Sequence, residues 1–327
     1  MRSGATSAAA SAGAVWPDFF IVGAPRCGTT ALSRYLSKHP QVCFSKPKEP
    51  HFFTLAEPQH NGVDLLKDYL HRFFPHYNPQ RHKVLGEGSV SYLYSPEAIR
   101  RILTINPRAK FIVSVRNPID MVRSYHARMI YTLDEDVQDL AQAWALQAER
   151  AQGRRLPKSC RDRRMLQYRE IGAMGQNVKR LFEIAGRERC KIVLFDDLIA
   201  DPRKTYCELL AFLGLDDDGR TYFSQKRRTR RFRHPLLQRL VVRPPRSLVA
   251  LLRLMQRGTK GNRLNKRLRG HMRRLNTESA GYAPIDGEMR HTLARFFAAD
   301  VSLLGQLLDR DLSIWQLEDT ALSGDHP

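Results

Sequence analysis

A short apolar run that leads into a glycine loop and a helix is the feature that most restricts how this chain folds. Residues Phe19–Val22 form the run, Gly23–Thr30 the loop, and residues 31–39 carry apolar side chains at helical spacing until Pro40. An uninterrupted apolar run is typical of a strand that is buried on both faces. A strand–loop–helix unit of this kind presents backbone N–H groups and a helix N-terminus, which together favour an anion such as phosphate.

Similar apolar runs recur between helical patterns further along the chain. The runs at 110–115 and 191–195 predict two more strands, and helices are expected at 118–131, 137–150, 175–185, 202–213 and in a C-terminal segment that starts at Asp286. Strands that alternate with helices predict an α/β fold with a central, mainly parallel sheet flanked by helices, and a basic helical C-terminal portion.

The expected division of the chain is a disordered leader at 1–16, one domain at 17–318 and a tail at 319–327. The leader is rich in Ala, Ser and Gly and lacks the apolar run of a signal peptide or membrane anchor. The five cysteines are odd in number and include no C-x-x-C pair, which argues against a disulfide scaffold or a zinc site. These features favour a cytoplasmic protein.

Positive charge is concentrated in one segment. The chain carries a formal net charge of +21, and the residues from Lys226 to Arg274 hold 18 Lys or Arg and no acidic residue. We expect a basic helical or lid segment at 226–275 within the domain. Its interpretations are a solvated face of helices that cap a cleft, a contact with an anionic acceptor, or a contact with an anionic membrane surface. Nucleic-acid binding is a further alternative, although no helix-turn-helix, zinc-finger or aromatic RNA-binding signature accompanies the charge.

The glycine loop has the spacing of a P-loop without its lysine. Gly23 and Gly28 are separated as in G-x-x-x-x-G-K-[ST], but Thr29 stands where the lysine belongs and the nearest cation is Arg26. The strand at 111–115 ends in Arg116 rather than in an aspartate that would support Mg²⁺. The pattern therefore predicts a site that neutralises anions with arginines instead of a metal. An ordinary strand-to-helix turn is the alternative interpretation of the loop.

Three motifs in order resemble the sulfotransferases that use 3′-phosphoadenosine 5′-phosphosulfate (PAPS), in particular their bacterial and heparan-sulfate branches. Pro25–Thr30 is similar to the family's 5′-phosphosulfate loop, and Val115–Pro118, with Ser124 eight residues after the arginine, is similar to its 3′-phosphate motif. Lys48–Phe53 resembles a segment in which the glutamate is the proposed base. Weaker likenesses at 86–92, at 194–198 and near Trp315 extend the resemblance over nearly the whole chain.

The resemblance implies a P-loop-like sulfotransferase fold and a role for each matching residue. Glu49 is implied as general base, with His51 sharing or replacing it, and Arg26 as the cation on the bridging oxygen. The expected cofactor-binding residues are Arg26, Cys27, Gly28, Thr29, Thr30, Arg116, Ser124 and, in a loop over the 3′-phosphate, Arg228, Arg230 and Arg231. From the residues alone, a surface carboxylate paired with Lys46 or Lys48 is the favoured interpretation of Glu49, and a core histidine is the alternative for His51; the resemblance reverses the preference for Glu49. Related enzymes carry a lysine where this chain has Gly88, so that segment supplies no cation, and Glu87 is a further candidate there.

The sequence thus predicts metal-independent transfer of a sulfuryl group from PAPS to a hydroxyl of a glycan, lipid or small molecule, with an amine as the second choice of acceptor. Because a carboxylate in a cleft near a polyanion is harder to ionise, we expect a raised pKa for Glu49. The alternatives are a P-loop nucleotide or small-molecule kinase that depends on Mg²⁺-ATP, and a basic nucleic-acid- or membrane-binding protein without enzymatic activity.

Overall fold

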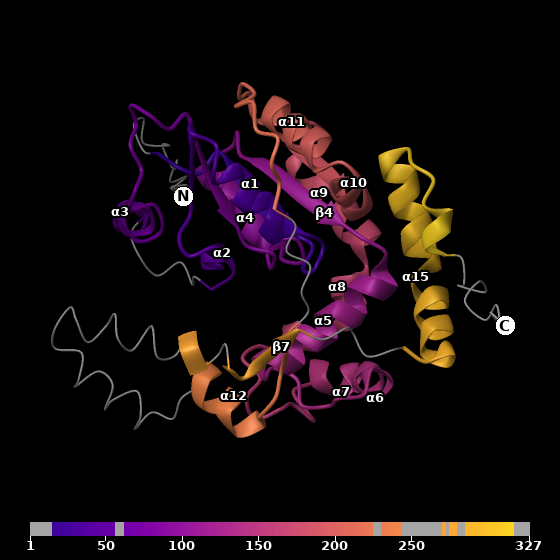
Figure 1. The fold of residues 1–327 in the computed structure, drawn as a ribbon. Helices are drawn as coiled ribbons and strands as arrows, with labels where there is room; N and C mark the ends of the chain where they lie inside the picture. The colour runs from indigo at the N-terminus through magenta and orange to yellow at the C-terminus, as the bar shows by residue number, and fades with distance from the viewer. Residues whose placement is uncertain are drawn as a thin grey trace, which may run out of the picture. The chain divides into compact units, whose positions relative to one another are not determined.

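The protein chain forms two compact units that interleave along the sequence (Figure 1). The computed structural model describes residues 15–55, 62–224, 230–243, 270–272, 275–279 and 285–316. The described part of the first unit comprises residues up to 117, 173–224 and 298–316, and that of the second comprises 118–172 and the described residues of 230–297. The predicted leader and tail lie almost entirely outside the described residues, and the predicted single domain at 17–318 stays a prediction.

A five-stranded parallel sheet forms the centre of the first unit and confirms the predicted fold class. Its strand order is β2-β3-β1-β4-β5, so the first strand of the chain lies in the middle. The strands are β1 (Phe19–Gly23), β2 (Val42–Phe44), β3 (Val84–Gly88), β4 (Lys110–Val115) and β5 (Cys190–Leu194). All five run in one direction, so the loops that follow them gather at one edge of the sheet.

Helices pack against this sheet and bury both faces of β1. Phe19 and Ile21 belong to the core shared with α1 and α11, while Phe20 on the opposite face packs against the rings of Phe53 and Tyr92. The helices of this unit are α1 (Thr29–Leu36), α2 (Phe52–Leu55), α3 (Gly62–Phe73), α4 (Pro96–Ile105), α9 (Met174–Ala185), α10 (Phe195–Ala200) and α11 (Pro202–Leu213), with short 3₁₀ turns at Arg187–Arg189 and Ser313–Trp315. Burial on both sides explains why β1 and β4 are uninterrupted apolar runs.

The second unit is mainly helical. Its elements are α5 (Pro118–Thr132), α6 (Leu140–Ala145), α7 (Gln147–Ala151), a 3₁₀ turn at Arg163–Leu166, α8 (Tyr168–Gly172), α12 (Pro235–Val242) and the antiparallel pair β6 (Arg230–Phe232) and β7 (Thr277–Ser279). The helix α15 (Gly287–Leu308) begins in this unit and ends in the first. Asp286 accepts a hydrogen bond from the backbone N–H of Met289 at 2.6 Å, which confirms the predicted start of the C-terminal helix. The single helix predicted at 137–150 is wrong, because Asp139 caps a helix that starts only at Leu140 and a second helix follows.

A fully buried ion pair holds three segments of the second unit together. Arg150 donates to both oxygens of Glu135 at 2.5 and 2.7 Å, and the Tyr168 hydroxyl donates to the same carboxylate at 2.7 Å. The side chains of Arg150 and Glu135 are both 0 % exposed. Because each polar group has partners, the pair is a satisfied structural network.

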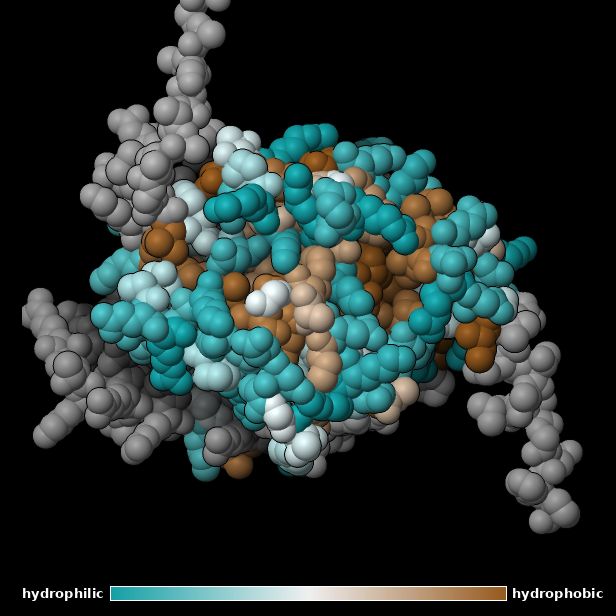
Figure 2. Space-filling view, turned by 90° about the horizontal axis from the view of Figure 1, so that it is seen from above, coloured by the Kyte–Doolittle hydropathy of each residue, from teal (hydrophilic) through white to brown (hydrophobic). Residues whose placement is uncertain are grey.

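The face drawn in Figure 2 is covered mostly by hydrophilic side chains, with hydrophobic ones between them. Most of the basic segment at 226–275 lies outside the described residues. Within the part of the chain that the structure describes, none of the helices combines the length and apolar character needed to cross a membrane.

Candidate functional site

The loop between β1 and α1 is a tight backbone cradle. Gly28 precedes α1 with a φ of 87°, in the left-handed region, and a Cβ there would lie 2.8 Å from the Leu198 side chain. Glycine is therefore required at this position by both conformation and space. The N–H groups of Ala31 and Leu32 bond to the Gly28 carbonyl, whereas Thr29 and Thr30 occupy the first turn, where a helix offers its N–H groups no acceptor.

The same loop is fastened to the neighbouring strand β4. The backbone N–H of Ala24 donates to the Ser114 carbonyl at 2.7 Å, and the Ser114 hydroxyl donates to the Cys27 carbonyl. Cys27 itself is buried, and burial raises the pKa of its thiol to about 12 despite the nearby arginine charges. The Cys27 side chain is thus a packed thiol of the loop, and a role in binding a ligand would fall to its backbone.

One predicted arginine, Arg26, belongs to this loop, and a second, Arg116, lies near it. Arg26 and Arg116 are both half-buried, and the charge of each lowers the pKa of the Cys27 thiol against the larger effect of burial. The Arg116 guanidinium stacks over the Phe195 ring, 4.7 Å from its centre. Arg26 follows β1 and Arg116 follows β4, and these two strands are neighbours in the sheet. The next strand after β1 is β2 at one edge of the sheet, and the next strand after β4 is β5 at the other edge. The two cations therefore flank the position at which open parallel sheets bind ligands.

The cradle suits a phosphate-bearing group. It combines N–H groups at the start of α1, a glycine that leaves the backbone bare, and two guanidinium groups that match phosphate oxygens. Thr29 is buried and Thr30 is exposed, so only the second hydroxyl is open to solvent. Among the described residues, no group of three or more His, Cys, Asp or Glu is arranged to hold a metal ion.

Glu49 and His51 lie together in a strained loop that follows β2. Both residues have left-handed backbone, with φ values of 67° and 53°, and such conformations at non-glycine residues gather at functional sites. The Lys48 ammonium donates to one Glu49 oxygen at 2.7 Å, and His51 Nε2 lies 3.5 Å from the other. Lys48, rather than Lys46, is therefore the partner of Glu49.

The predicted rise in the Glu49 pKa is wrong for this structure. Burial raises it, but the hydrogen bonds and charges of His51 and Lys48 outweigh burial and lower the Glu49 pKa to about 2. The sequence argument considered a neighbouring polyanion and not the two cationic or hydrogen-bonding neighbours in the same loop. Glu49 is consequently an ionised carboxylate throughout the physiological range.

A buried carboxylate on β3, Glu87, is linked to this loop through hydrogen bonds. Glu87 on β3 is fully buried and accepts hydrogen bonds from the Ser89 hydroxyl at 2.6 Å and from the Tyr69 hydroxyl. The Ser89 hydroxyl in turn accepts from the backbone N–H of His51 at 3.0 Å, and the N–H of Glu49 donates to the Gly88 carbonyl at 2.8 Å. Burial raises the pKa of Glu87 against these hydrogen bonds. The sequence offered Glu87 only as a further candidate in the segment 86–92, and it did not indicate Tyr69 as a partner.

The remaining predicted residues lie elsewhere in the chain. Ser124 is a buried residue of α5 in the second unit. Arg228 lies outside the described residues, Arg230 is described only as a backbone position of β6, and Arg231 is an exposed residue of the same strand. Their roles stay predictions.

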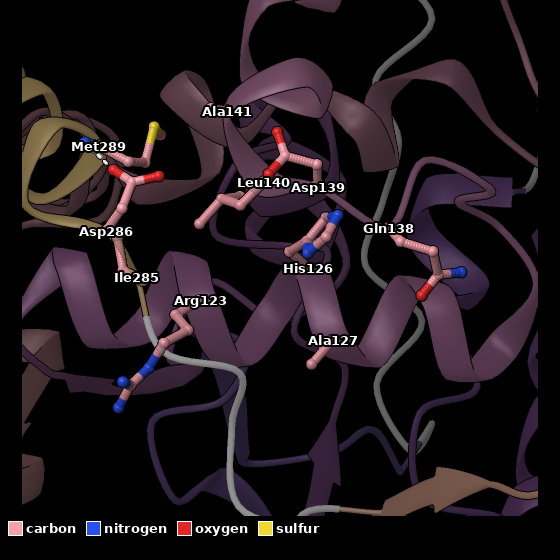
Figure 3. Close-up of a pocket in the computed structure, with 10 residues that line it drawn as sticks. All are labelled: Arg123, His126, Ala127, Gln138, Asp139, Leu140, Ala141, Ile285, Asp286 and Met289. Carbon is pink, nitrogen blue, oxygen red and sulfur yellow. Dashed lines mark hydrogen bonds between the residues drawn. The ribbon is translucent and has the colours of Figure 1, made fainter.

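The second unit contains a small polar pocket that no sequence motif indicated (Figure 3). Its volume is about 110 Å³, and Figure 3 shows His126 of α5 close to Asp139, with Asp286 bonded to the Met289 backbone. Both carboxylates cap helices, which accounts for their presence. The pocket is smaller than those that enclose organic ligands, so it does not compete with the cradle as a nucleotide site.

Comparison with known proteins gives one family and several relatives. Residues 17–219 match the model of the sulfotransferase family. The chain is 32 % identical over 111 residues to the membrane-associated sulfotransferase kil1 of Dictyostelium discoideum, covering 34 % of this chain and 22 % of that protein. It is 36 % identical over 114 residues to human bifunctional heparan sulfate N-deacetylase/N-sulfotransferase 2, covering 34 % of this chain and 12 % of that one. The matches thus span about a fifth or less of these relatives.

A solved structure is similar over almost the entire chain. The crystal structure of a sulfotransferase from Alicyclobacillus acidocaldarius has a TM-score of 0.64 and 26 % identity, and the match covers 93 % of this chain and 100 % of that chain.

Proposed function

The chain belongs to the sulfotransferase family, and we propose that it moves a sulfuryl group from PAPS to a hydroxyl group of a glycan, lipid or small molecule, with Glu49 as general base. The observation that carries the proposal is the arrangement of one unit: an arginine-flanked cradle after β1 and β4, and an ionised carboxylate in a strained loop supported by β3. A phosphate site and a base on one sheet edge are what such a transfer requires.

The cradle residues would hold the donor. The N–H groups of Thr29 and Thr30 at the start of α1 suit the 5′-phosphate, and Arg26 would neutralise charge on the oxygen that links phosphate and sulfur. Arg116 would take the 3′-phosphate, held by its stack on Phe195. When bound, PAPS supplies an activated sulfur whose bond to the acceptor oxygen forms while its bond to the 5′-phosphate oxygen breaks.

Glu49 provides the base that the acceptor needs. An ionised carboxylate oxygen takes the hydroxyl proton as the acceptor oxygen becomes a nucleophile, and the resulting carboxylic acid returns the proton to solvent. His51, whose Nδ1 lies 2.7 Å from the Ser91 hydroxyl, keeps its Nε2 directed at Glu49 and orients the carboxylate. The heparan sulfate N-sulfotransferase name among the relatives supports a glycan as one acceptor class, with an amine as a second acceptor group.

Binding of adenosine 3′,5′-bisphosphate tests the donor site. We expect the bisphosphate, without metal, to raise the melting temperature, and Mg²⁺-ATP to do so much less. Arg116→Met should weaken this binding by about tenfold or more, the value of a charge-assisted hydrogen bond. Arg108→Met is the matched control, because Arg108 is an exposed arginine that precedes β4, whereas Arg116 follows it.

Stabilisation by Mg²⁺-ATP alone would identify a kinase and reject the proposal. If the bisphosphate binds, transfer of labelled sulfate from PAPS into fractionated extracts would identify the acceptor. Equal weakening of bisphosphate binding by Arg108→Met and Arg116→Met would contradict the assignment of Arg116.

A further inference from the structure

Lys48 is a cation of the candidate site that none of the roles above uses. Its ammonium lies 2.7 Å from Glu49 Oε1, and the side chains of Lys48 and Glu49 are 21 % and 36 % exposed. An ion pair that is partly open to solvent contributes little to stability, because water competes for both groups. Stability therefore does not account for a lysine held against the carboxylate of the base.

The stem of Lys48 lies close to the last residue of β3. A Cβ built on Gly88 would lie 3.5 Å from Lys48 Cε and 3.4 Å from the Ser33 hydroxyl of α1. The Ser33 hydroxyl bonds to the Thr29 carbonyl at 2.6 Å, so it stands one turn above the start of the helix. Gly88 leaves room for the lysine, and Lys48 Cε and the Ser33 hydroxyl of α1 both lie close to this end of β3.

The ion pair restrains the base. With Lys48 and His51 on its two oxygens, the Glu49 carboxylate has a pKa of about 2 and a weak affinity for a proton. General bases work best when their pKa lies near the operating pH. Loss of one cation from Glu49 would raise its pKa and make it a stronger base. An anion placed next to α1 would compete with Glu49 for the flexible ammonium of Lys48.

We propose that Lys48 is shared between the base and the donor: it holds Glu49 while the cradle is empty and turns to the sulfuryl oxygens when PAPS is bound, which frees Glu49 to take the acceptor proton. This inference rests on the proposed function, and it adds a residue that links donor binding to activation of the base. No bond changes in the turn itself, since the ammonium keeps its three protons and exchanges one anionic acceptor for another.

Donor binding without turnover tests the first half of the proposal. Titration calorimetry without acceptor would compare PAPS with adenosine 3′,5′-bisphosphate, which lacks the sulfuryl group. Lys48→Met keeps the length of the stem and removes the charge. We expect it to weaken PAPS binding about tenfold or more, the value of a hydrogen bond to a charged group, and to leave bisphosphate binding within about twofold. Lys46→Met, at an exposed lysine two residues earlier, is the matched control and should change neither.

The pH profile tests the second half. The pH dependence of kcat/KM for PAPS reports the free enzyme, whereas that of kcat/KM for the acceptor at saturating PAPS reports the donor complex. In the free wild-type enzyme Glu49 stays ionised well below pH 5, so the first profile should show no acid limb from this group between pH 5 and 8. Release from Lys48 should place the acid limb of the second profile at higher pH, and in Lys48→Met the two limbs should lie together, because the lysine charge is absent from both states.

Four results would decide against the inference or its premise. Equal loss of PAPS and bisphosphate binding in Lys48→Met would show that Lys48 supports the fold or the phosphates only. Unchanged PAPS binding in Lys48→Met would show that Lys48 does not bind the donor. An acid limb that does not move would show that Lys48 does not control the pKa of Glu49. Failure of the wild-type protein to bind either nucleotide would instead reject the proposed function itself.

Discussion

Two carboxylate–cation pairs, one in each unit, have similar chemistry and opposite settings. Glu135 and Arg150 in the second unit are 0 % exposed, and the Tyr168 hydroxyl completes the contacts of Glu135. Glu49 and Lys48 in the first unit are partly exposed and lie in a loop with left-handed backbone. Burial raises the carboxylate pKa in both pairs and is outweighed, by the His51 hydrogen bond and the Lys48 contacts at Glu49 and chiefly by the Arg150 hydrogen bonds at Glu135, so both pKa values are lowered.

The difference separates a pair that holds a fold from a pair that is available for chemistry. A buried pair with every atom bonded cannot exchange partners without leaving a charge unsatisfied. A partly exposed pair can exchange partners at little cost, because water or a ligand replaces the lost contact. A lowered pKa alone does not distinguish the two.

Glu49→Gln should have the largest effect on activity. Glutamine keeps the size of the side chain but cannot take the proton from the hydroxyl of the acceptor. We therefore expect kcat for sulfate transfer to fall by about 10²–10⁴-fold. Thermal stability and bisphosphate binding should stay close to wild type. Glu97→Gln, at the exposed start of α4, is the matched control for loss of a surface carboxylate.

Retention of full transfer by Glu49→Gln would move the role to His51. A double variant with His51→Ala would then settle whether either residue is the base.

Arg150→Met should have the largest effect on stability. Removal of the guanidinium leaves the buried Glu135 carboxylate without its cation, and breaking one partner of a buried pair costs about 3–5 kcal/mol. Urea denaturation would measure the loss. The control is Arg164→Met, which removes an exposed arginine paired with Asp162 in the same unit. A loss no larger than that of the control would show that the second unit does not depend on this network.

The sequence predicted those strands and helices whose own residues form a clear apolar pattern. β1 and β4 are apolar runs because helices cover both faces of the sheet, and their predicted bounds differ by at most one residue from those observed. β2 has three residues, and β3 interrupts its apolar residues with two glycines and Glu87. Gly86 is required because a Cβ would lie 2.1 Å from the Phe19 ring, a contact that only the pairing of β3 with β1 creates.

The sequence indicated which residues belong to the candidate site, but it did not indicate which side chains contact one another there. Arg26 and Arg116 were predicted from the glycine loop and from the end of an apolar run, and Glu49 from the family resemblance; the three residues follow β1, β4 and β2. The choice between Lys46 and Lys48 as partner of Glu49 depended on backbone conformation, which the sequence of this segment does not reveal. The direction of the Glu49 pKa shift depended on that same choice.

The pH dependence of the unfolding free energy should also distinguish the two carboxylates, Glu135 and Glu49, although by a smaller effect. The Glu135 pKa is lowered in the folded protein, because the Arg150 and Tyr168 hydrogen bonds outweigh burial, so its ionisation stabilises the fold above the unfolded value near 4.5. This stability is lost as pH falls through the folded pKa. Glu135→Gln should therefore flatten the dependence of unfolding free energy on pH below about 5. Glu49→Gln should flatten it less, because solvent screens its partly exposed pair. Equal slopes in the two variants would contradict the distinction between the pairs.

A third ion pair, Arg203 with Asp217, should show the smallest effect on stability and activity. It tests whether a low carboxylate pKa matters without burial or a place in the candidate site. Arg203 donates to both oxygens of Asp217 and lowers its pKa to about 2, the value found for Glu49. Both side chains are exposed to solvent, at 36 % and 47 %. We expect Arg203→Gln to change neither the urea midpoint nor the rate of sulfate transfer measurably. A loss of stability comparable to that of Arg150→Met would mean that strength of pairing, rather than burial and position, determines what these pairs contribute.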